Sequence, residues 1–281
     1  ASRSARRSTS VVFPVSEWPA IPRTLILPRG RSWPIGVATY AIVAYGRAMP
    51  DSPSTDDSRS TGESPAVRGV VLAGGASTRF GEGDKALATL DGRPLVAHVV
   101  ESVAAATDGP PLLSVADESD GARLRDALEG TSVETVVDVP ALSGPLAGIY
   151  AAAETVEADW LFVCACDMPL VSAAGIAAVR DAAARSAAVA TDDGAAPDAL
   201  VPVVEEYDQP LHALYRRRAL DRARPALAAG DAIMALLDEL RVERVTAADL
   251  DLSDATATLA AATTNVNTRE DLDAVREHQC E

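Results

Sequence analysis

The sequence predicts an α/β protein in which helices cover both faces of a mostly parallel sheet. From about Pro65, short apolar runs of strand length alternate with alanine-rich stretches of helical spacing. Such alternation is typical of right-handed β-α-β units, whose crossover helices lie on the faces of a parallel sheet. Glycines and carboxylates directly follow several of these runs. Because a doubly wound sheet binds ligands at the carboxyl ends of its strands, the pattern also predicts where a site lies.

The first part of the pattern alternates strictly. Arg68–Leu72 is an apolar run that ends in glycines, and Pro94–Ala106 repeats its leucine and valines at helical spacing. Further short apolar runs predict strands, and longer alanine-rich runs predict helices. In chain order, the elements that follow are a strand at Leu112–Val115, a helix at Ala122–Leu128, a strand at Val133–Val137, a helix at Pro145–Val156, a strand at Trp160–Ala165, a helix at Ala173–Arg185 and a strand at Ala187–Ala190.

Beyond residue 195 the pattern changes. Ala199–Val204 and Pro210–Arg216 are apolar runs that predict two strands joined by the polar turn 205–209. Thr268 is a good N-cap, and the acidic residues after it suit the first turn of a helix. The elements expected after the two strands are helices at 217–229 and 231–240, strands at 241–246 and Thr263–Val266, and a last helix that opens at Thr268.

Composition excludes several classes of protein. The 281 residues carry a formal charge of −16, whereas nucleic-acid binders and proteins of anionic membranes need clustered positive charge. No apolar run approaches the roughly 20 residues that span a bilayer. The three cysteines do not form a disulfide framework, which favours a reducing compartment. We therefore expect a cytoplasmic protein without nucleic-acid or membrane partners.

The charge is distributed unevenly along the chain. Residues 1–48 contain seven arginines and one acid, a charge of +6, and the remainder carries −22. We expect 1–64 to be a disordered basic leader followed by a linker rich in Ser, Asp and Pro, and 65–281 to be the domain. Residues 1–48 are expected to be translated from sequence upstream of a start at Met49 and so not to be native coding sequence, with a basic functional arm as the alternative. The acidic domain, with one lysine among 25 basic residues, also predicts adaptation to high salt.

A glycine-rich loop is the first candidate binding motif. The segment LAGGASTRFGEGDK, residues 72–85, leads from a predicted strand into Gly74 and Gly75, which lack a Cβ and let backbone N–H groups approach an anion. Arg79 and Lys85 add positive charge at a spacing that lets a loop wrap a triphosphate. Neither G-x4-G-K-[ST] nor G-x-G-x-x-G is present. Lys85 stands where a compact point charge for phosphate is useful.

Two carboxylates at strand ends are the next candidates. Asp167 follows the predicted central strand in CACDMP, and a carboxylate there is costly unless it is paired or coordinates a metal. Asp167 is therefore predicted to bind Mg²⁺ shared with substrate phosphates, with helix capping as the alternative. Cys164 and Cys166 are expected to pack. Asp138 opens the segment DVPALSGPLAGI.

Glycines in that same segment admit two interpretations. Gly144 and Gly148 would let a flat group or a backbone come close. The alternative is ordinary helix-start chemistry, because proline suits the first helical position.

The chain contains, in this order, LAGGASTRFGEGDKAL, DGRPLVAHV, SGPLAGI, CDMP, QPLHALYR and NVNTREDL. These segments resemble the molybdenum cofactor guanylyltransferases, and the resemblance covers about residues 67–277. It implies a Rossmann-like nucleotidyltransferase fold and transfer of GMP from GTP to the terminal phosphate of molybdopterin, with Mg²⁺ and release of pyrophosphate. It also implies transient contact with other enzymes of the molybdenum cofactor.

The resemblance carries roles over by position. It places the phosphates of GTP at Arg79 and Lys85, the guanosine at Asp138, and Mg²⁺ with GTP at Asp167. The remaining residues that it implies are Leu72, Ala73, Gly74 and Gly75 at the nucleotide, Gly144 and Gly148 near the nucleotide or pterin, and Asn265 and Asn267 on the acceptor side.

One departure from the family concerns the second strand. Family members often end this strand with an Asn that contacts the nucleotide, whereas this chain has the segment from Leu113 to Asp117. Asp117 and Ser114 are the two candidates to replace it.

Two functional alternatives remain open. A related nucleotidyltransferase would use another NTP, or a phosphorylated sugar or polyol as acceptor. A non-catalytic nucleotide-binding protein is disfavoured, since it would have little need of Arg79, Lys85 and Asp167 together. His212 is expected either to pack or to contact the acceptor. The run 216–218 of three arginines is expected either to be solvated or to bind the anionic pterin.

Overall fold

The structure is a computed structural model that describes residues 65–75, 80, 84–189 and 196–280. The basic leader and linker expected at 1–64, and Arg79, lie outside these ranges. In the described part of the chain, no helix combines the length and apolar composition needed to cross a membrane.

In the described part of the chain, eight strands form the main sheet in the order β10-β7-β9-β6-β1-β4-β5, with β8 paired to β7. Neighbouring strands are parallel except where β9 meets β6 and β7 and where β8 meets β7. The mostly parallel α/β fold predicted from the sequence is therefore confirmed. The strands are β1 (Val67–Leu72), β4 (Leu112–Val115), β5 (Glu134–Val137), β6 (Trp160–Ala165), β7 (Ala199–Val204), β8 (Tyr207–Asp208), β9 (His212–Arg216) and β10 (Val242–Val245).

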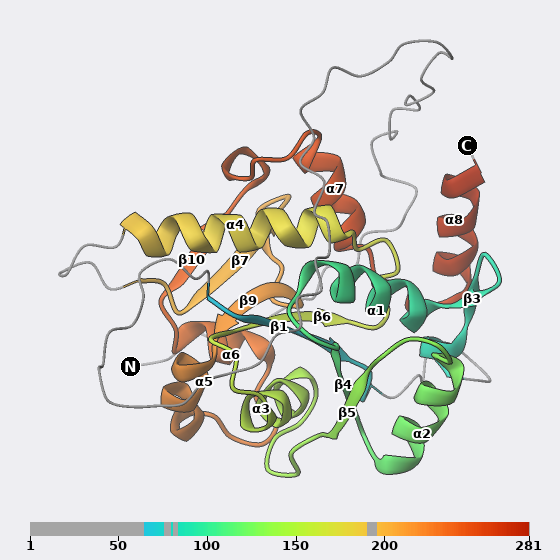
Figure 1. Ribbon diagram of the computed structural model, residues 1–281, viewed down its shortest axis with the longest axis horizontal. Coiled ribbons are helices and arrows are strands. Elements are labelled where there is room, and N and C mark those ends of the chain that lie inside the picture. The colour runs from blue at the N-terminus through green and yellow to red at the C-terminus, as the bar shows by residue number, and fades with distance from the viewer. Residues whose placement is uncertain (1–64, 76–79, 81–83, 190–195, 281) are drawn as a thin grey trace, which may run out of the picture. The chain divides into compact units, whose positions relative to one another are not determined.

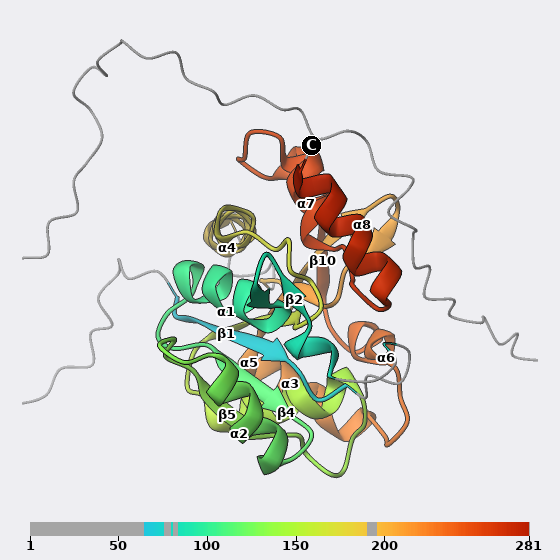
Figure 2. The same ribbon diagram turned by 90° about the vertical axis from the view of Figure 1, so that its right-hand side faces the viewer.

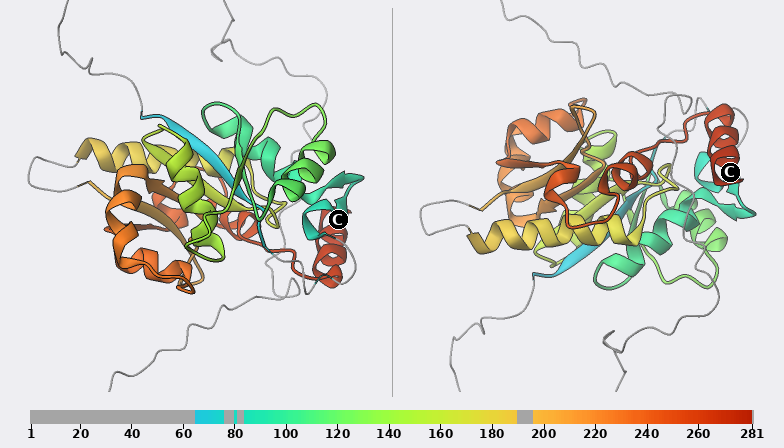
Figure 3. Two further views of the ribbon diagram at one scale, coloured as in Figure 1. Left: turned by 90° about the horizontal axis from the view of Figure 1, so that it is seen from below. Right: turned by 90° about the horizontal axis from the view of Figure 1, so that it is seen from above.

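Helices cover both faces of the sheet. Figure 1 shows α1, α4 and α7 on one side and α3, α5 and α6 on the other, and the two views of Figure 3 show each side in turn. The α-helices are α1 (Leu95–Ala106), α2 (Glu118–Ala127), α3 (Pro145–Thr155), α4 (Ala173–Val189), α5 (Arg217–Ala223), α6 (Ile233–Asp238), α7 (Ala255–Ala262) and α8 (Arg269–Cys280). Short 3-10 helices lie at η2 (Lys85–Leu87), η3 (Arg224–Ala226) and η4 (Ala247–Asp249).

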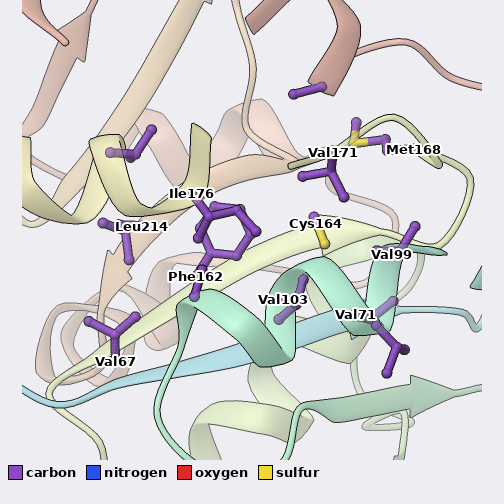
Figure 4. Packing of buried hydrophobic residues seen from close by; sticks show 14 of the residues in the cluster. Val67, Val71, Val99, Val103, Phe162, Cys164, Met168, Val171, Ile176 and Leu214 are labelled. Carbon is purple, nitrogen blue, oxygen red and sulfur yellow. The ribbon is translucent and has the colours of Figure 1, made fainter. Parts of the chain in front are cut away.

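Alternation along the buried strands builds a core on each face. On β6, Trp160, Phe162 and Cys164 pack on the side of α1 and α4, whereas Leu161 and Val163 pack on the side of α3. This period of two is what a strand that is buried on both faces requires. Figure 4 shows Phe162 and Cys164 packed among side chains from α1 and α4. The two cores fix the carboxyl ends of the central strands.

A third apolar cluster anchors the C-terminal helix. Leu272 and Val275 of α8 pack with Leu90 and Leu95, next to the hairpin of β2 (Thr89–Leu90) and β3 (Arg93–Pro94). Figure 2 shows α8 beside this hairpin. The predicted cap is present, since the Thr268 hydroxyl accepts a hydrogen bond of 3.1 Å from the N–H of Asp271. This anchoring brings the segment before α8 to the end of β6, where the N–H of Val266 donates to the Asp167 carbonyl at 2.8 Å.

Some predicted elements are wrong. The strand expected at Ala187–Ala190 is not present up to Val189, because α4 continues through that residue. Alanine is the best helix former, and no breaker separates the two predicted elements. The strand expected at Thr263–Val266 is irregular chain, and α7 before it was not predicted. The helix α2 begins four residues before its predicted start, because Asp117 caps it by accepting from the N–H groups of Ser119 and Asp120.

His212 on β9 belongs to the core. Its side chain is fully buried, neither ring nitrogen has a hydrogen-bond partner in the described part of the chain, and its ring meets that of Phe162 edge-on with centroids 5.2 Å apart. Burial lowers the pKa of His212 to about 4. Of the two sequence-based interpretations, packing is the one that this environment favours.

Acid is therefore expected to destabilise the fold through His212. The unfolded chain protonates this imidazole near pH 6.5, whereas the folded chain does so only near pH 4. The free energy of unfolding should fall by up to about 3 kcal/mol as the pH drops through this window, and be unaffected by His212 above it. Denaturant unfolding of the wild type and of His212→Phe from pH 7 to pH 4 measures the difference. Equal pH dependence in the two proteins would contradict this role.

Candidate active site

A pocket lies at the carboxyl ends of β1, β4, β5 and β6. Strand register brings these ends together, since Leu72 of β1 lies opposite Ser114 of β4 on one side and Ala165 of β6 on the other. The chain runs outward from β1 to β4 and β5 and then returns to β6, so the pocket lies at the point where the strand order reverses. The described residues that line it are Leu72, Ala73, Gly74, Gly75, Asp84, Lys85, Ala86, Ser114, Asp138, Gly144, Pro145, Gly148, Ala165, Cys166, Asp167 and Leu211.

Backbone hydrogen bonds hold the turn after β1 in place. The N–H of Ala73 donates to the Ser114 carbonyl at 2.7 Å, and the N–H of Cys166 donates to the Leu72 carbonyl at 3.0 Å. Gly74 then passes close to β5, because a Cβ built at this position would lie 2.3 Å from Oδ2 of Asp138. Only glycine leaves room for that carboxylate, which explains why the loop motif has a glycine at position 74.

Lys85 is held at the edge of the pocket by two partners from distant parts of the chain. The Asp84 carboxylate caps η2 by accepting from the N–H of Ala86 at 3.0 Å, which sets the direction of the helix that carries Lys85. The Lys85 ammonium lies 2.5 Å from Oδ2 of Asp167 and donates to Oδ1 of Asn267 at 3.2 Å. The side chains of Lys85 and Asp167 are 18% and 13% exposed, so the ion pair is largely shielded from water but still reachable from the pocket.

Asp167 has an oxygen that suits a hard cation. Its Oδ2 pairs with Lys85, but its Oδ1 is buried and has no hydrogen-bond partner among the described residues. A buried carboxylate oxygen without a partner is costly, and a cation would relieve that cost. In the described part of the chain, no group of three or more His, Cys, Asp or Glu residues is placed to hold a metal ion by itself. One carboxylate with substrate phosphates completing the coordination is the arrangement that Mg²⁺ often adopts.

Asp138 is the second carboxylate of the pocket, and its environment differs. The Ser114 hydroxyl donates a short hydrogen bond to its Oδ1, and among the described residues no basic side chain forms an ion pair with it. Burial raises the pKa of Asp138, and the hydrogen bond from Ser114 opposes that rise. Among the described residues, Asp167 thus lies beside a cation and Asp138 has only a hydroxyl as a side-chain partner, whereas Asp84, the third carboxylate that lines the pocket, caps η2.

Some of the other expected site residues lie at the pocket, and others do not contact it. Gly144 lines the pocket with a φ of +58° as the N-cap of α3, and Asn267 accepts a hydrogen bond from Lys85 at the pocket edge. Asn265 instead donates from its side-chain amide to the Thr263 carbonyl at 3.3 Å, although the resemblance implied a common acceptor role for both asparagines. The thiol of Cys166 also lines the pocket, and burial raises its pKa to about 12, so it stays neutral.

The three arginines at 216–218 do not join the site. Arg216 lies opposite Trp160 at the start of β6, which is the opposite end of that strand from Asp167. Its guanidinium stacks on the Trp160 ring at 4.5 Å. Because β9 runs antiparallel to β6, the end of β9 that leads into this run lies at the far end of β6 from the pocket. The alternative that the run binds an anionic substrate in the pocket is therefore wrong.

Sequence reasoning missed what Ser114 does. The sequence offers Ser114 only, together with Asp117, as a replacement for a nucleotide-binding Asn. Asp117 caps α2 and is absent from the residues that line the pocket, whereas Ser114 lies in the pocket and contacts Asp138. No local sequence signal indicates this contact, because it joins the side chains of two neighbouring strands.

Comparison with known proteins shows the family to which the chain belongs. Residues 69–245 match the family described as the MobA-like NTP transferase domain, and this match spans more than half of the chain. The chain belongs to the MobA-like NTP transferase family. It is therefore a nucleotidyltransferase, and the resemblance drawn from its motifs is confirmed.

The chain is similar to two sequence relatives that share a description and to a solved structure. A probable molybdenum cofactor guanylyltransferase of Natronomonas pharaonis is 35% identical over 181 residues, which are 63% of this chain and 83% of the relative. The molybdenum cofactor guanylyltransferase of Vibrio cholerae is 32% identical over 206 residues, 72% of this chain and 88% of the relative. The crystal structure of molybdopterin-guanine dinucleotide biosynthesis protein A from Archaeoglobus fulgidus aligns with a TM-score of 0.56 and 25% identity, covering 76% of this chain and 98% of that one.

Proposed function

We propose that this enzyme transfers GMP from GTP to the terminal phosphate of molybdopterin and releases pyrophosphate. One observation supports the proposal most strongly: Lys85, Asp167 and Asp138 all line one pocket at the strand ends, and glycines line the same pocket. The names of the relatives from Natronomonas pharaonis and Vibrio cholerae support the guanylyl group and the molybdenum cofactor as acceptor.

Asp138 is the proposed contact for guanine. Guanine presents two neighbouring donors, N1–H and the 2-amino group, which a carboxylate can accept together. Adenine and cytosine place a ring acceptor beside their amino group, so a carboxylate meets only one donor there. Asp138 suits this role because it is half-buried and, among the described residues, has only the Ser114 hydroxyl as a partner. Leu72, Ala73 and Gly74 would supply backbone and a flat apolar surface beside the base.

Lys85 and Asp167 are proposed for the phosphates. Asp167, with its unpartnered Oδ1, would hold Mg²⁺ together with the phosphate oxygens of GTP. When bound, Mg²⁺ supplies positive charge that screens the α- and β-phosphate oxygens. The Lys85 ammonium, already held at the pocket edge, stabilises the charge that develops on the departing pyrophosphate. Arg79 is proposed to help there and lies outside the described residues.

The chemistry asks little covalent work of the protein. A terminal phosphate oxygen of molybdopterin attacks the α-phosphorus of GTP in line, the new P–O bond forms, and the α–β bridging bond breaks so that pyrophosphate leaves. The acceptor phosphate has a second pKa of about 6 and is largely ionised near pH 7, so no strong general base is needed. The protein contributes positioning and fixed charge.

Gly74→Ala is expected to weaken GTP binding at least about tenfold. The added Cβ would overlap Oδ2 of Asp138, so either the turn after β1 or the carboxylate has to move. Isothermal titration calorimetry with GTP measures the loss. Gly121→Ala on α2 is the matched control, because the added Cβ would lie 3.4 Å from a side-chain methyl of Val115, which is an ordinary van der Waals distance. Wild-type affinity in Gly74→Ala, or equal losses in both variants, would contradict the packing argument.

A turnover assay tests the function. Incubation with GTP, MgCl₂ and molybdopterin should release pyrophosphate and form the guanine dinucleotide, whereas CTP in place of GTP should give little of either. Efficient turnover of CTP, or of a phosphorylated sugar or polyol as acceptor, would instead favour the related nucleotidyltransferase reaction. Transient contact with the enzymes that use the cofactor, and a cytoplasmic location, are parts of the same proposal.

A further inference from the structure

We propose that Ser114 is a positioning residue that fixes the Asp138 carboxylate for recognition of the nucleobase. The inference deepens the proposed function and rests on it. It assigns control over the guanine preference of the enzyme to a residue of β4 that the sequence offers only as a candidate replacement for a nucleotide-binding Asn.

Ser114 joins three strands at the wall of the pocket. Its side chain is fully buried, and its hydroxyl donates to Oδ1 of Asp138 at the end of β5. Its own carbonyl accepts the N–H of Ala73, at the end of β1, at 2.7 Å. The residue therefore ties the carboxylate to the turn that passes beneath the proposed base. A hydrogen bond from a buried hydroxyl to a charged group is among the stronger contacts a side chain can make.

The space for the Ser114 hydroxyl is provided by Gly148. A Cβ at Gly148 would lie 2.5 Å from the Ser114 Oγ and 2.7 Å from Cδ2 of Leu72, well inside contact distance. The glycine in the first turns of α3 thus leaves room for Ser114 in its observed position. The sequence predicts either the close approach of a flat group or a backbone at this glycine or helix-start chemistry, and the structure points to a steric role behind the carboxylate.

The two oxygens of Asp138 are consequently not equivalent. Oδ1 is occupied by Ser114, and Oδ2 lies over Gly74. Without the hydroxyl, the carboxylate would be free to rotate, since among the described residues no ion pair holds it. A fixed carboxylate plane is what two neighbouring donors on one base require, because both hydrogen bonds depend on the same orientation.

Ser114 also affects the charge on Asp138. Burial raises the pKa of Asp138 and the Ser114 hydrogen bond lowers it, so removal of the hydroxyl raises the pKa further. The neighbouring faces of β1, β4 and α3 add no titratable side chain to the pocket, and among the described residues its other titratable lining groups are Asp84, Lys85, Cys166 and Asp167. A protonated Asp138 loses an acceptor for guanine, so the loss of GTP binding on acidification should begin at a higher pH in Ser114→Ala.

Equilibrium binding of GTP and ITP tests the inference without any turnover. ITP lacks the 2-amino group, so the ratio of the two affinities reports recognition by the carboxylate. Ser114→Ala should bind GTP about tenfold more weakly, reduce the GTP-over-ITP preference, and shift the acidic limb of GTP binding to higher pH. Thr107→Val removes a buried hydroxyl that bonds within α1, remote from the pocket, and should change none of these quantities.

A double-mutant cycle separates positioning from a general structural effect. In an Asp138→Asn background, Ser114→Ala should cost far less GTP affinity than in the wild type, because the carboxylate it orients is gone. Ser114→Cys, of similar shape but a weaker donor, should fall between Ser114→Ala and the wild type. Unchanged GTP affinity in Ser114→Ala, or an equal loss in the Asp138→Asn background, would overturn the inference. A wild-type chain that binds GTP but transfers no GMP would refute the proposed reaction and leave this inference standing, whereas one that binds no GTP would refute both.

Discussion

Lys85→Ala is expected to lower kcat/KM for GMP transfer by about two to three orders of magnitude while the fold stays intact. The ammonium is held at the pocket by Asp167 and Asn267, and preorganised charge at a developing anion is worth about this much in enzymes. Lys85 is the single lysine among the 25 basic residues of the sequence, so no second lysine is available to replace it. Steady-state pyrophosphate release, with circular dichroism as the check on folding, measures the effect.

The matched control for Lys85 is a neighbouring arginine. Arg123 is half-exposed on α2 and forms an ion pair with Asp84 at 3.3 Å, one residue from Lys85, but it does not line the pocket. Arg123→Ala should leave kcat/KM within about threefold of the wild type, as expected for an exposed ion pair. A Lys85→Ala enzyme with near-normal turnover, or one no worse than Arg123→Ala, would refute the role of Lys85.

Asp167→Asn is expected to have an equally large effect, for a different reason. The amide keeps the shape of the side chain but loses the charge that would hold Mg²⁺ at the buried Oδ1 position. Turnover should fall by about three orders of magnitude, and the Mg²⁺ concentration for half-maximal rate should rise. A magnesium titration of the reaction rate measures both quantities.

Asp138→Asn is the matched comparison, because it changes another carboxylate of the same pocket. It should weaken GTP binding and reduce the preference for GTP over other nucleotides, while the Mg²⁺ dependence of the rate stays close to that of the wild type. The two substitutions thus separate a metal-binding from a base-binding carboxylate. If both shifted the Mg²⁺ dependence equally, or if neither did, the assignment of roles would be wrong.

The hydrophobic patterns predicted the central part of the fold well. Leu112–Val115 and Trp160–Ala165 have the predicted bounds, because a short apolar run between polar turns has few alternatives to a buried strand. The pattern failed where composition was uniform. In the alanine-rich chain after Ala173, nothing local marks the end of α4, and α7 consists largely of alanine and threonine. What these segments pack against decides their structure, and that information is not local.

The sequence could predict those site residues that directly follow a strand. Asp138 and Asp167 each follow a strand, and both line the pocket as expected. Contacts that cross between distant segments could not be predicted. Asn267 holds Lys85 across 182 residues of sequence, and the Ser114 hydroxyl reaches Asp138 from the neighbouring strand. Both depend on register and on the anchoring of α8, which no motif encodes.

Label transfer tests the central claim most directly. The enzyme is incubated with molybdopterin, MgCl₂ and GTP that carries radioactive phosphorus at the α position in one sample and at the γ position in another. The proposed reaction predicts that the α label enters the guanine dinucleotide in the wild type, that the γ label is released as pyrophosphate, and that Asp167→Asn abolishes both. Release of the γ label as orthophosphate, with no α label on the molybdopterin product, would contradict guanylyl transfer by this chain.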